Sequence, residues 1–585
     1  MQKRCEIEDK YKWDLSSYIK DETELQNNLK YLKENAVKYR DFYGKFTDKE
    51  ELKRYLSFDE QYSLTFYKTS SYIGHTLDTD TSNTKYINYS QQLEFIAKES
   101  GEAGSYITPQ LNELANDYLK ELIEDKELVN YKLFFKDILK NKPHKIDEKD
   151  SELLSKMSLC LGNDSAVFDT LTNGEIKFDS ITNQNGEKFD VYEADYSKWL
   201  NNKDRMLRQG AFKSIMNGYG GKVRTISCLY TNDIQYDIFY NKLTKFKSTR
   251  ERAMFYEDVD SKVYDILIKN ISSRVGVLQD ILKIKSRYLN IKDMAYYDVM
   301  LNIGQDVNYT IEHAIQMVKD STQILGAEYS NILNEKFNQK VIDYLPNQNK
   351  QTGAYSSGVY GCPSIVLMNF VNDYNSVSTL AHEIGHAMHT EFSNQTQPMQ
   401  MADYVIFVAE VASTVNEILL NLHVSKNSSQ DEKVSLIFEL LDSLRTTVFR
   451  QTMFSEFEDY SHNQLENGNP LTYEDYSNKY FELNKKYYGE SIVLPEELKF
   501  EWARIPHFYR PFYVYKYATG FISALCIVEN LLEDSEYYKK YINFLKSGCS
   551  KPPVELLQDI GVDLTTDKPY KKAFKFINNL INEIK

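Results

Sequence analysis

The feature of this chain that most restricts its fold is a helical spacing of apolar and charged residues along most of its 585 residues. The spacing runs through residues 15–170, 196–345 and 376–585. Apolar positions that recur every three or four residues predict amphipathic helices. Only 23 glycines and 12 prolines are available to interrupt these helices. We therefore predict a mainly α fold built from long helices.

Two segments depart from the helical spacing and predict small β structures. In residues 173–192, an Asn-Gly pair at 185–186 stands between two alternating runs, which is a strong hairpin signal. Residues 353–370 read GAYSSGVYGCPSIVLMNF, with three glycines and a proline followed by β-branched and apolar residues. This second segment predicts a strand, a turn and another strand. We expect it to form a small sheet just before the helix described next.

Charge and composition exclude several classes of protein. The chain has 70 Lys and Arg against 85 Asp and Glu, a net charge of -15, whereas nucleic-acid binding requires a basic face. No apolar run reaches the roughly 20 residues that span a bilayer, and the N-terminus lacks the apolar core of a signal peptide. The six cysteines have no paired spacing. We expect a cytoplasmic protein with neither nucleic acid nor membrane as a partner.

Residues 380–392 read LAHEIGHAMHTEF and contain the pattern HExxH. Residues four apart share one face of a helix, so His382 and His386 can both bind a single Zn²⁺. Glu383 lies about 100° round the helix, where it reaches the water beside the metal and can act as a general base. Gly385 costs about 1 kcal/mol relative to alanine in mid-helix, which indicates a crowded backbone. The motif predicts a zinc hydrolase with one zinc ion.

A hydrolytic zinc site needs a third protein ligand. Glu410 lies within the apolar residues 405–412, where an unpaired carboxylate is costly unless it binds metal. Glu410 is therefore the preferred third ligand, and Glu417, two turns further on the same face, is the alternative. The 23 residues between His386 and Glu410 exceed the thermolysin-like spacing. The metzincin pattern requires glycine at the position of His389, so His389 is expected to pack beside the site.

An aromatic segment near the C-terminus, residues 502–520, offers hydrogen-bond donors. It reads WARIPHFYRPFYVYKYATG, and a helix is predicted to begin near Pro511. Peptide hydrolysis at zinc produces an oxyanion that suitably placed donors stabilise. A buried aromatic helix is an equally good interpretation of the same residues. The candidate donors are His507, Tyr509, Tyr513, Tyr515 and Tyr517.

Taken together, these motifs resemble those of the oligoendopeptidase F group in the thimet oligopeptidase family of zinc metallopeptidases. The resemblance covers essentially the whole chain. It rests on YKWDLSSYI, GAYSSGVYGCPSI, HEIGHAMH, FVAEVASTVNE and RIPHFYRPFYVYKYATG. It implies a two-lobed helical clam-shell with a deep channel and a small β-sheet insert beside the zinc helix. It also implies a helical N-terminal region, 1–190, that ends in the hairpin, and a catalytic region, 191–585.

The same resemblance implies a zinc-dependent endopeptidase that hydrolyses internal bonds of short peptides with a Glu-activated water. Its metal ligands would be His382, His386 and Glu410, with Glu383 as the base. His507 would stabilise the oxyanion together with Tyr513 and Tyr515, and with Tyr509 in reserve. The edge of residues 355–360 would pair with the substrate backbone.

Two alternatives remain open at this stage. A zinc carboxypeptidase or dipeptidyl carboxypeptidase on a similar helical fold would use the same ligands and base. A peptide-binding or scaffold protein with a degenerate metal site is the alternative from another class. The positions of cleavage separate the two enzymes, and a metal assay separates both from the scaffold.

Overall fold

The computed structural model describes residues 2–157, 161–304 and 307–585. The mainly α prediction is confirmed, because helices make up nearly all the regular structure of the described residues. Among these residues, none of the helices combines the length and the apolar character needed to cross a membrane. Cys160 lies outside the described residues, and the other five cysteines are free thiols. The cytoplasmic location stays a prediction.

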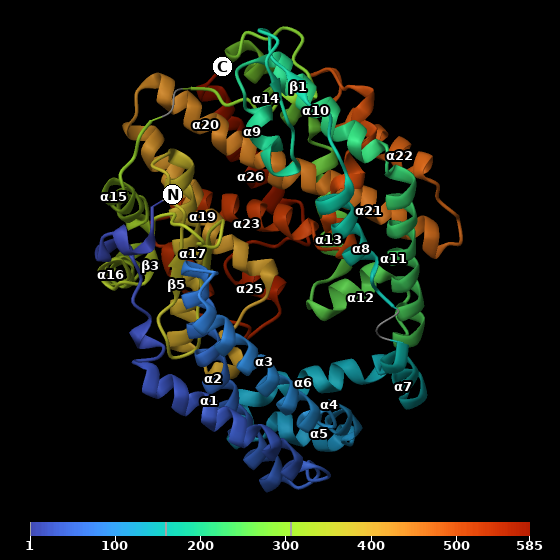
Figure 1. Ribbon diagram of the computed structural model, residues 1–585, viewed down its shortest axis with the longest axis vertical. Coiled ribbons are helices and arrows are strands. Elements are labelled where there is room, and N and C mark those ends of the chain that lie inside the picture. Colours follow the sequence, from blue (N-terminus) through green and yellow to red (C-terminus); the bar gives the residue numbers. More distant parts are fainter. Residues whose placement is uncertain (1, 158–160, 305–306) are drawn as a thin grey trace.

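The N-terminal helices of residues 22–141 lie together at the bottom of Figure 1, and those of residues 148–170 lie toward its right. In the first of them, α1, Leu25, Leu29 and Leu32 are buried at helical spacing, and the Asp21 carboxylate caps the N-terminus by accepting from Glu24 N–H. The helices of this part are α1 (Glu22–Ala36), α2 (Lys49–Thr79), α3 (Thr84–Gly104), α4 (Ile107–Glu113), α5 (Asn116–Glu124), α6 (Lys132–Asn141), α7 (Glu148–Met157) and α8 (Asp164–Thr170).

The predicted hairpin is present between the N-terminal helices and the next group. Strands β1 (Ile181–Thr182) and β2 (Lys188–Phe189) pair antiparallel, and Gly186 adopts a φ of +82° in the turn between them. The following helices are α9 (Tyr196–Leu200), α10 (Arg205–Gly220), α11 (Val223–Thr244), α12 (Thr249–Tyr256), α13 (Ser261–Ser272), α14 (Val275–Tyr288), α15 (Ile311–Ser321) and α16 (Gly326–Asn338). The proposed domain boundary near residue 190 stays a prediction.

The second predicted β segment is also confirmed, and it belongs to a three-stranded sheet. Strands β4 (Tyr355–Ser357) and β5 (Ile365–Leu367) pair antiparallel. A strand that the sequence did not indicate, β3 (Ile342–Asp343), pairs parallel with β5. The strand order is β3-β5-β4, so β4 lies at an edge. This sheet packs on helix α17, as expected of an insert beside the metal helix.

The remaining helices lie in the centre and on both sides of the molecule (Figure 1). They are α17 (Tyr374–Thr396), α18 (Met399–Ala402), α19 (Ile406–Asn427), α20 (Gln430–Leu444), α21 (Arg450–Glu466), α22 (Tyr473–Tyr488), α23 (Tyr515–Glu533), α24 (Tyr538–Leu545), α25 (Pro553–Asp559) and α26 (Lys568–Glu583). The predicted helix start near Pro511 is wrong, because α23 begins only at Tyr515.

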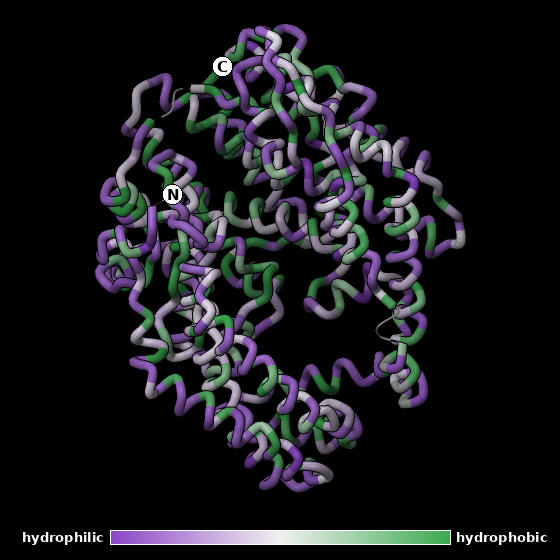
Figure 2. Tube along the Cα trace, viewed as in Figure 1, coloured by the Kyte–Doolittle hydropathy of each residue, from purple (hydrophilic) through white to green (hydrophobic). Residues whose placement is uncertain are grey.

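Two groups of helices form the two lobes in Figure 1. Helices α15–α19 and the sheet make up one, and α8, α11, α12, α21 and α22 make up the other. Helix α23 joins them, because it contacts α19 in the first lobe and α21 in the second. Figure 2 shows hydrophobic and hydrophilic residues alternating along the outer helices, as amphipathic helices require.

A cavity of about 840 Å³ opens where the N-terminal helices meet both lobes. Its lining comes from α6, from the end of α12, from the start of α19 and from residues 548–556. Tyr404 and Val408, which lie two to six residues before Glu410, are part of this lining. The cavity therefore reaches the chain segment that carries one of the candidate metal ligands.

Candidate metal centre

Helices α17 and α19 hold the candidate ligands, and they pack unusually closely. A Cβ atom added to Gly385 would lie 2.5 Å from the Cα of Ser413 and 2.7 Å from the carbonyl oxygen of Ala412. Only a glycine permits this approach of two backbones. The mid-helix glycine of the HExxH motif is therefore explained by the contact between α17 and α19.

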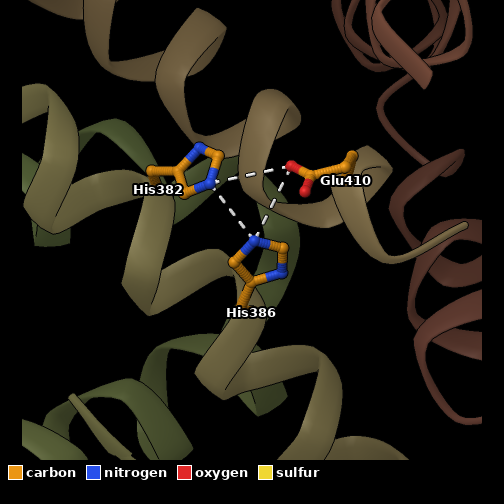
Figure 3. Close-up of side chains that lie close together, drawn as sticks. All are labelled: His382, His386 and Glu410. Carbon is orange, nitrogen blue, oxygen red and sulfur yellow. Dashed lines mark hydrogen bonds and ion pairs between the residues drawn. The ribbon is translucent and has the colours of Figure 1, made fainter. Parts of the chain in front are cut away.

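This contact brings His382, His386 and Glu410 together, as Figure 3 shows. The two histidine Nε2 atoms are 3.2 Å apart. Oε2 of Glu410 lies 3.7 Å from Nε2 of His382 and 3.8 Å from Nε2 of His386. Ligand atoms bound tetrahedrally to zinc at 2.0–2.2 Å are about 3.3–3.6 Å from one another. The donor types and their spacing therefore fit a single zinc ion.

Glu417 orients one of these histidines. Nδ1–H of His382 donates to Oε1 of Glu417 at 2.5 Å, which directs Nε2 toward the other two candidate ligands. Burial disfavours the charged form of His382, but the hydrogen bond and the charge of Glu417 outweigh it and raise the pKa to about 9. Glu417, the alternative third ligand, thus lies behind His382, whereas Glu410 lies in the cluster.

His389 lies apart from the three donors. It is buried, and its ring stacks on the ring of Tyr404 with centroids 3.7 Å apart. Burial lowers the pKa of His389 to about 3, so its imidazole is neutral at pH 7. Packing against Tyr404 agrees with the expectation that His389 is not a ligand.

Glu383 is close to the cluster but not part of it. Its side chain is buried, and burial raises its pKa to about 7, with the charges of Glu410 and Glu417 acting in the same direction and His382 opposing them. A carboxyl group whose pKa lies near neutrality can both accept and return a proton. These properties suit a general base beside a metal site.

Three donors gather on the side of the second lobe. His507 lies on the short 3-10 helix Pro506–Tyr509. Its ring is stacked with that of Tyr513 at 6.2 Å between centroids, and its Nε2 lies 3.5 Å from the hydroxyl oxygen of Tyr517. Burial lowers the pKa of His507, which keeps the imidazole neutral at pH 7. A neutral imidazole still has one N–H to donate.

Tyr517 connects this group of donors with the candidate ligands. Burial raises the pKa of Tyr517 above its ordinary value, and the nearby Tyr513 and the charge of Glu410 add to the effect. Helix α23 also approaches Glu410 directly, because a Cβ on Gly520 would lie 3.5 Å from the Cβ of that glutamate. Helix α23, which carries both Gly520 and Tyr517, therefore packs against Glu410.

Two tyrosines expected from the sequence point elsewhere. Tyr515 is buried, and its hydroxyl donates to Glu257 at 3.4 Å. Tyr509 packs its ring on Phe168 with centroids 4.7 Å apart. The structure thus brings Tyr513 to His507 but not Tyr515 or Tyr509. Tyr517 is among the candidate donors of the aromatic segment, but spacing does not single it out, because Tyr513 precedes the first residue of α23.

A helical two-lobed fold with two histidines, one glutamate and a separate buried carboxyl has the residues that a metal-dependent hydrolase requires. Residues 199–576 match the model of peptidase family M3, and residues 110–178 match a model described as Oligopeptidase F. The chain therefore belongs to peptidase family M3. This confirms the resemblance inferred from the sequence motifs.

Individual relatives agree over nearly the whole chain. Oligopeptidase PepF of Bacillus subtilis is 32% identical over 99% of this chain and 88% of its own length. Group B oligopeptidase PepB of Streptococcus agalactiae is 30% identical over 99% of this chain and 98% of its own. The crystal structure of oligoendopeptidase-F from Enterococcus faecium covers 96% of this chain and 98% of its own, with a TM-score of 0.73 and 26% identity.

Proposed function

We propose that this chain is a zinc-dependent endopeptidase that cleaves internal bonds of short peptides. The observation that carries the proposal is the spacing of the Nε2 atoms of His382 and His386 and Oε2 of Glu410, 3.2–3.8 Å, beside the buried carboxyl of Glu383. The relatives named as oligopeptidases and oligoendopeptidases support short peptides as the substrate class.

In this proposal, His382, His386 and Glu410 hold the zinc ion and Glu383 moves the proton. Bound zinc would act as a Lewis acid toward the peptide carbonyl and would favour deprotonation of the attacking water. The Glu383 carboxylate accepts that proton and returns it to the amine of the departing peptide. Glu417 keeps His382 in one tautomer and one orientation through the bond to Nδ1.

His507, Tyr513 and Tyr517 are proposed to act on the carbonyl oxygen. The negative charge that develops there during hydrolysis is stabilised by hydrogen-bond donors. The His507 imidazole and the Tyr517 hydroxyl are 3.5 Å apart, so both can reach one oxygen atom. Tyr513 stacks on His507 and supports the orientation of its ring. Tyr517 replaces Tyr515 in this assignment because Tyr515 faces Glu257.

The edge strand β4 is proposed to bind the substrate backbone. Among the strands of the described residues, β4 pairs only with β5, so its other edge can pair with an extended peptide. The backbone of Ser356 in β4 also lowers the pKa of Glu383 by hydrogen bonding, which opposes the larger effect of burial. A peptide on this edge would therefore lie near the general base. Backbone pairing recognises a peptide without requiring particular side chains.

Mass spectrometry of the products from a short synthetic peptide tests this function, with and without a zinc chelator. Internal cuts that the chelator abolishes are expected. Stepwise loss of residues from the C-terminus would instead favour a carboxypeptidase or dipeptidyl carboxypeptidase. Cleavage that persists without zinc would contradict the proposed metal dependence.

A further inference from the structure

The connection between His507 and helix α23 contains one residue with a left-handed backbone. Phe512 has a φ of +54°, a conformation that a bulky L-residue rarely adopts. It stands between the 3-10 helix that carries His507 and the start of α23. Such a conformation persists only where surrounding contacts determine it. The contacts of Phe512 therefore determine how the two elements are joined.

Helices α21 and α13 supply these contacts. Oε1 of Glu458 accepts a hydrogen bond from Phe512 N–H at 2.7 Å, and the Glu458 side chain is fully buried. One turn later on the same helix, His462 packs against the Phe512 ring with centroids 4.9 Å apart. Tyr264 contacts the Phe512 ring as well, at 5.6 Å. Both the backbone and the side chain of Phe512 are thus held.

The turn at Phe512 separates the side chains that follow it into two groups. Tyr513 and Tyr517 lie with His507, and their rings are 5.5 Å apart between centroids. Tyr515 lies with Glu257 instead. Because Phe512 is the joint between these donors, a change in its φ would rotate His507 relative to α23. The approach of His507 to the Tyr517 hydroxyl depends on that joint.

We propose that Glu458 is a positioning residue for peptide cleavage, acting through the Phe512 backbone on His507 and Tyr517. The inference rests on the proposed function, which assigns His507 and Tyr517 to the carbonyl oxygen of the substrate. Burial raises the pKa of Glu458 well above its ordinary value, which favours the neutral carboxyl. A glutamine has the same shape and the same accepting oxygen.

Two substitutions of Glu458 test this role by their kinetics. Glu458→Leu removes the acceptor, and kcat should fall about 10- to 100-fold, as expected for misplaced catalytic groups, while KM and zinc content stay near wild type. Glu458→Gln should restore kcat. A Leu variant with wild-type kcat would overturn the proposal, and so would a Gln variant as impaired as the Leu variant.

Glu466→Leu is a matched control on the same helix. Glu466 also accepts a backbone hydrogen bond at 2.7 Å, from Thr249 N–H, but Thr249 begins α12 and does not join the donors. This variant should lose stability and keep its kcat. A loss of kcat equal to that of Glu458→Leu would show that any broken contact of α21 has the same effect, which would overturn the specific role of Glu458.

Hydrogen exchange of residues 508–516 gives a readout that does not depend on activity. The segment should exchange slowly in the wild type and in Glu458→Gln, and at least about tenfold faster in Glu458→Leu, because its Phe512 amide loses its acceptor. Fast exchange in the folded wild type would overturn the inference even if Glu458→Leu did not fold. Absence of peptide cleavage by the wild type would refute the proposed function alone, since the exchange result stands independently.

Discussion

Replacing Gly385 by alanine directly tests the close contact between α17 and α19. The new methyl group would meet the Cα of Ser413 at 2.5 Å and the carbonyl oxygen of Ala412 at 2.7 Å. Both are backbone atoms, so no side chain can rotate away. Ordinary contacts between carbon atoms are about 3.5–4.0 Å, so the helices must separate by roughly 1 Å.

The magnitude follows from two opposing effects. Alanine in place of a mid-helix glycine ordinarily stabilises by about 1 kcal/mol. Overpacking of a well-packed contact costs about 1–3 kcal/mol, and more where backbone must move. We expect the second effect to dominate, with a net loss of about 1–2 kcal/mol in the free energy of unfolding. The separation also moves Glu410 away from His382 and His386, and a displacement of roughly 1 Å is incompatible with zinc bonds of 2.0–2.2 Å.

The assay is urea unfolding of the zinc-free protein together with a zinc titration. Gly74→Ala in α2 is the matched control, because no atom lies within 4 Å of the added Cβ. The control should be more stable than wild type and bind zinc normally, whereas Gly385→Ala should be less stable and bind zinc more weakly. Equal stabilisation and equal zinc affinity in both variants would refute the packing argument.

Three further predictions concern single side chains. Glu417→Ala should weaken zinc binding about 10- to 100-fold by freeing Nδ1 of His382; competition with a chelator measures this, and unchanged affinity would contradict it. Tyr517→Phe should lower kcat about 100-fold or more with little change in KM; a wild-type kcat would exclude its hydroxyl as a donor. Burial lowers the pKa of His462 to about 3, so below pH 6.5 only the unfolded chain takes up this proton. The free energy of unfolding of the wild type should therefore fall by up to about 1.4 kcal/mol per pH unit as the pH falls from 6.5, and that of His462→Leu should fall by less. If the free energies of unfolding of the two proteins fell equally from pH 7 to pH 5, the prediction would be contradicted.

Local signals in the sequence account for most of the fold and for the centre of the site. HExxH places two histidines on one helix face by spacing alone, and the apolar surroundings of Glu410 indicate its unusual role. The Asn185-Gly186 pair predicts the hairpin because the turn itself requires a positive φ. Strand β3 could not be predicted this way. It has only two residues, and its partner β5 lies more than 20 residues later in the chain.

The arrangement of the aromatic donors depends on contacts between distant residues. The left-handed residue in that segment is Phe512, and a phenylalanine carries no sequence signal for this conformation. Its backbone partner, Glu458, is 54 residues earlier in the chain. The helix therefore begins at Tyr515 rather than near Pro511, and Tyr517 rather than Tyr515 meets His507. The spacing of residues within one segment therefore does not predict these contacts.

The central claim is that three residues hold zinc while a fourth, Glu383, transfers the proton. Glu383→Gln separates these roles, because it preserves the shape of the side chain and removes the basic carboxylate. Zinc content and peptide cleavage are measured on the same preparation. The account predicts one zinc ion per chain and loss of turnover. A zinc-loaded variant that cleaves peptides at the wild-type rate would contradict it.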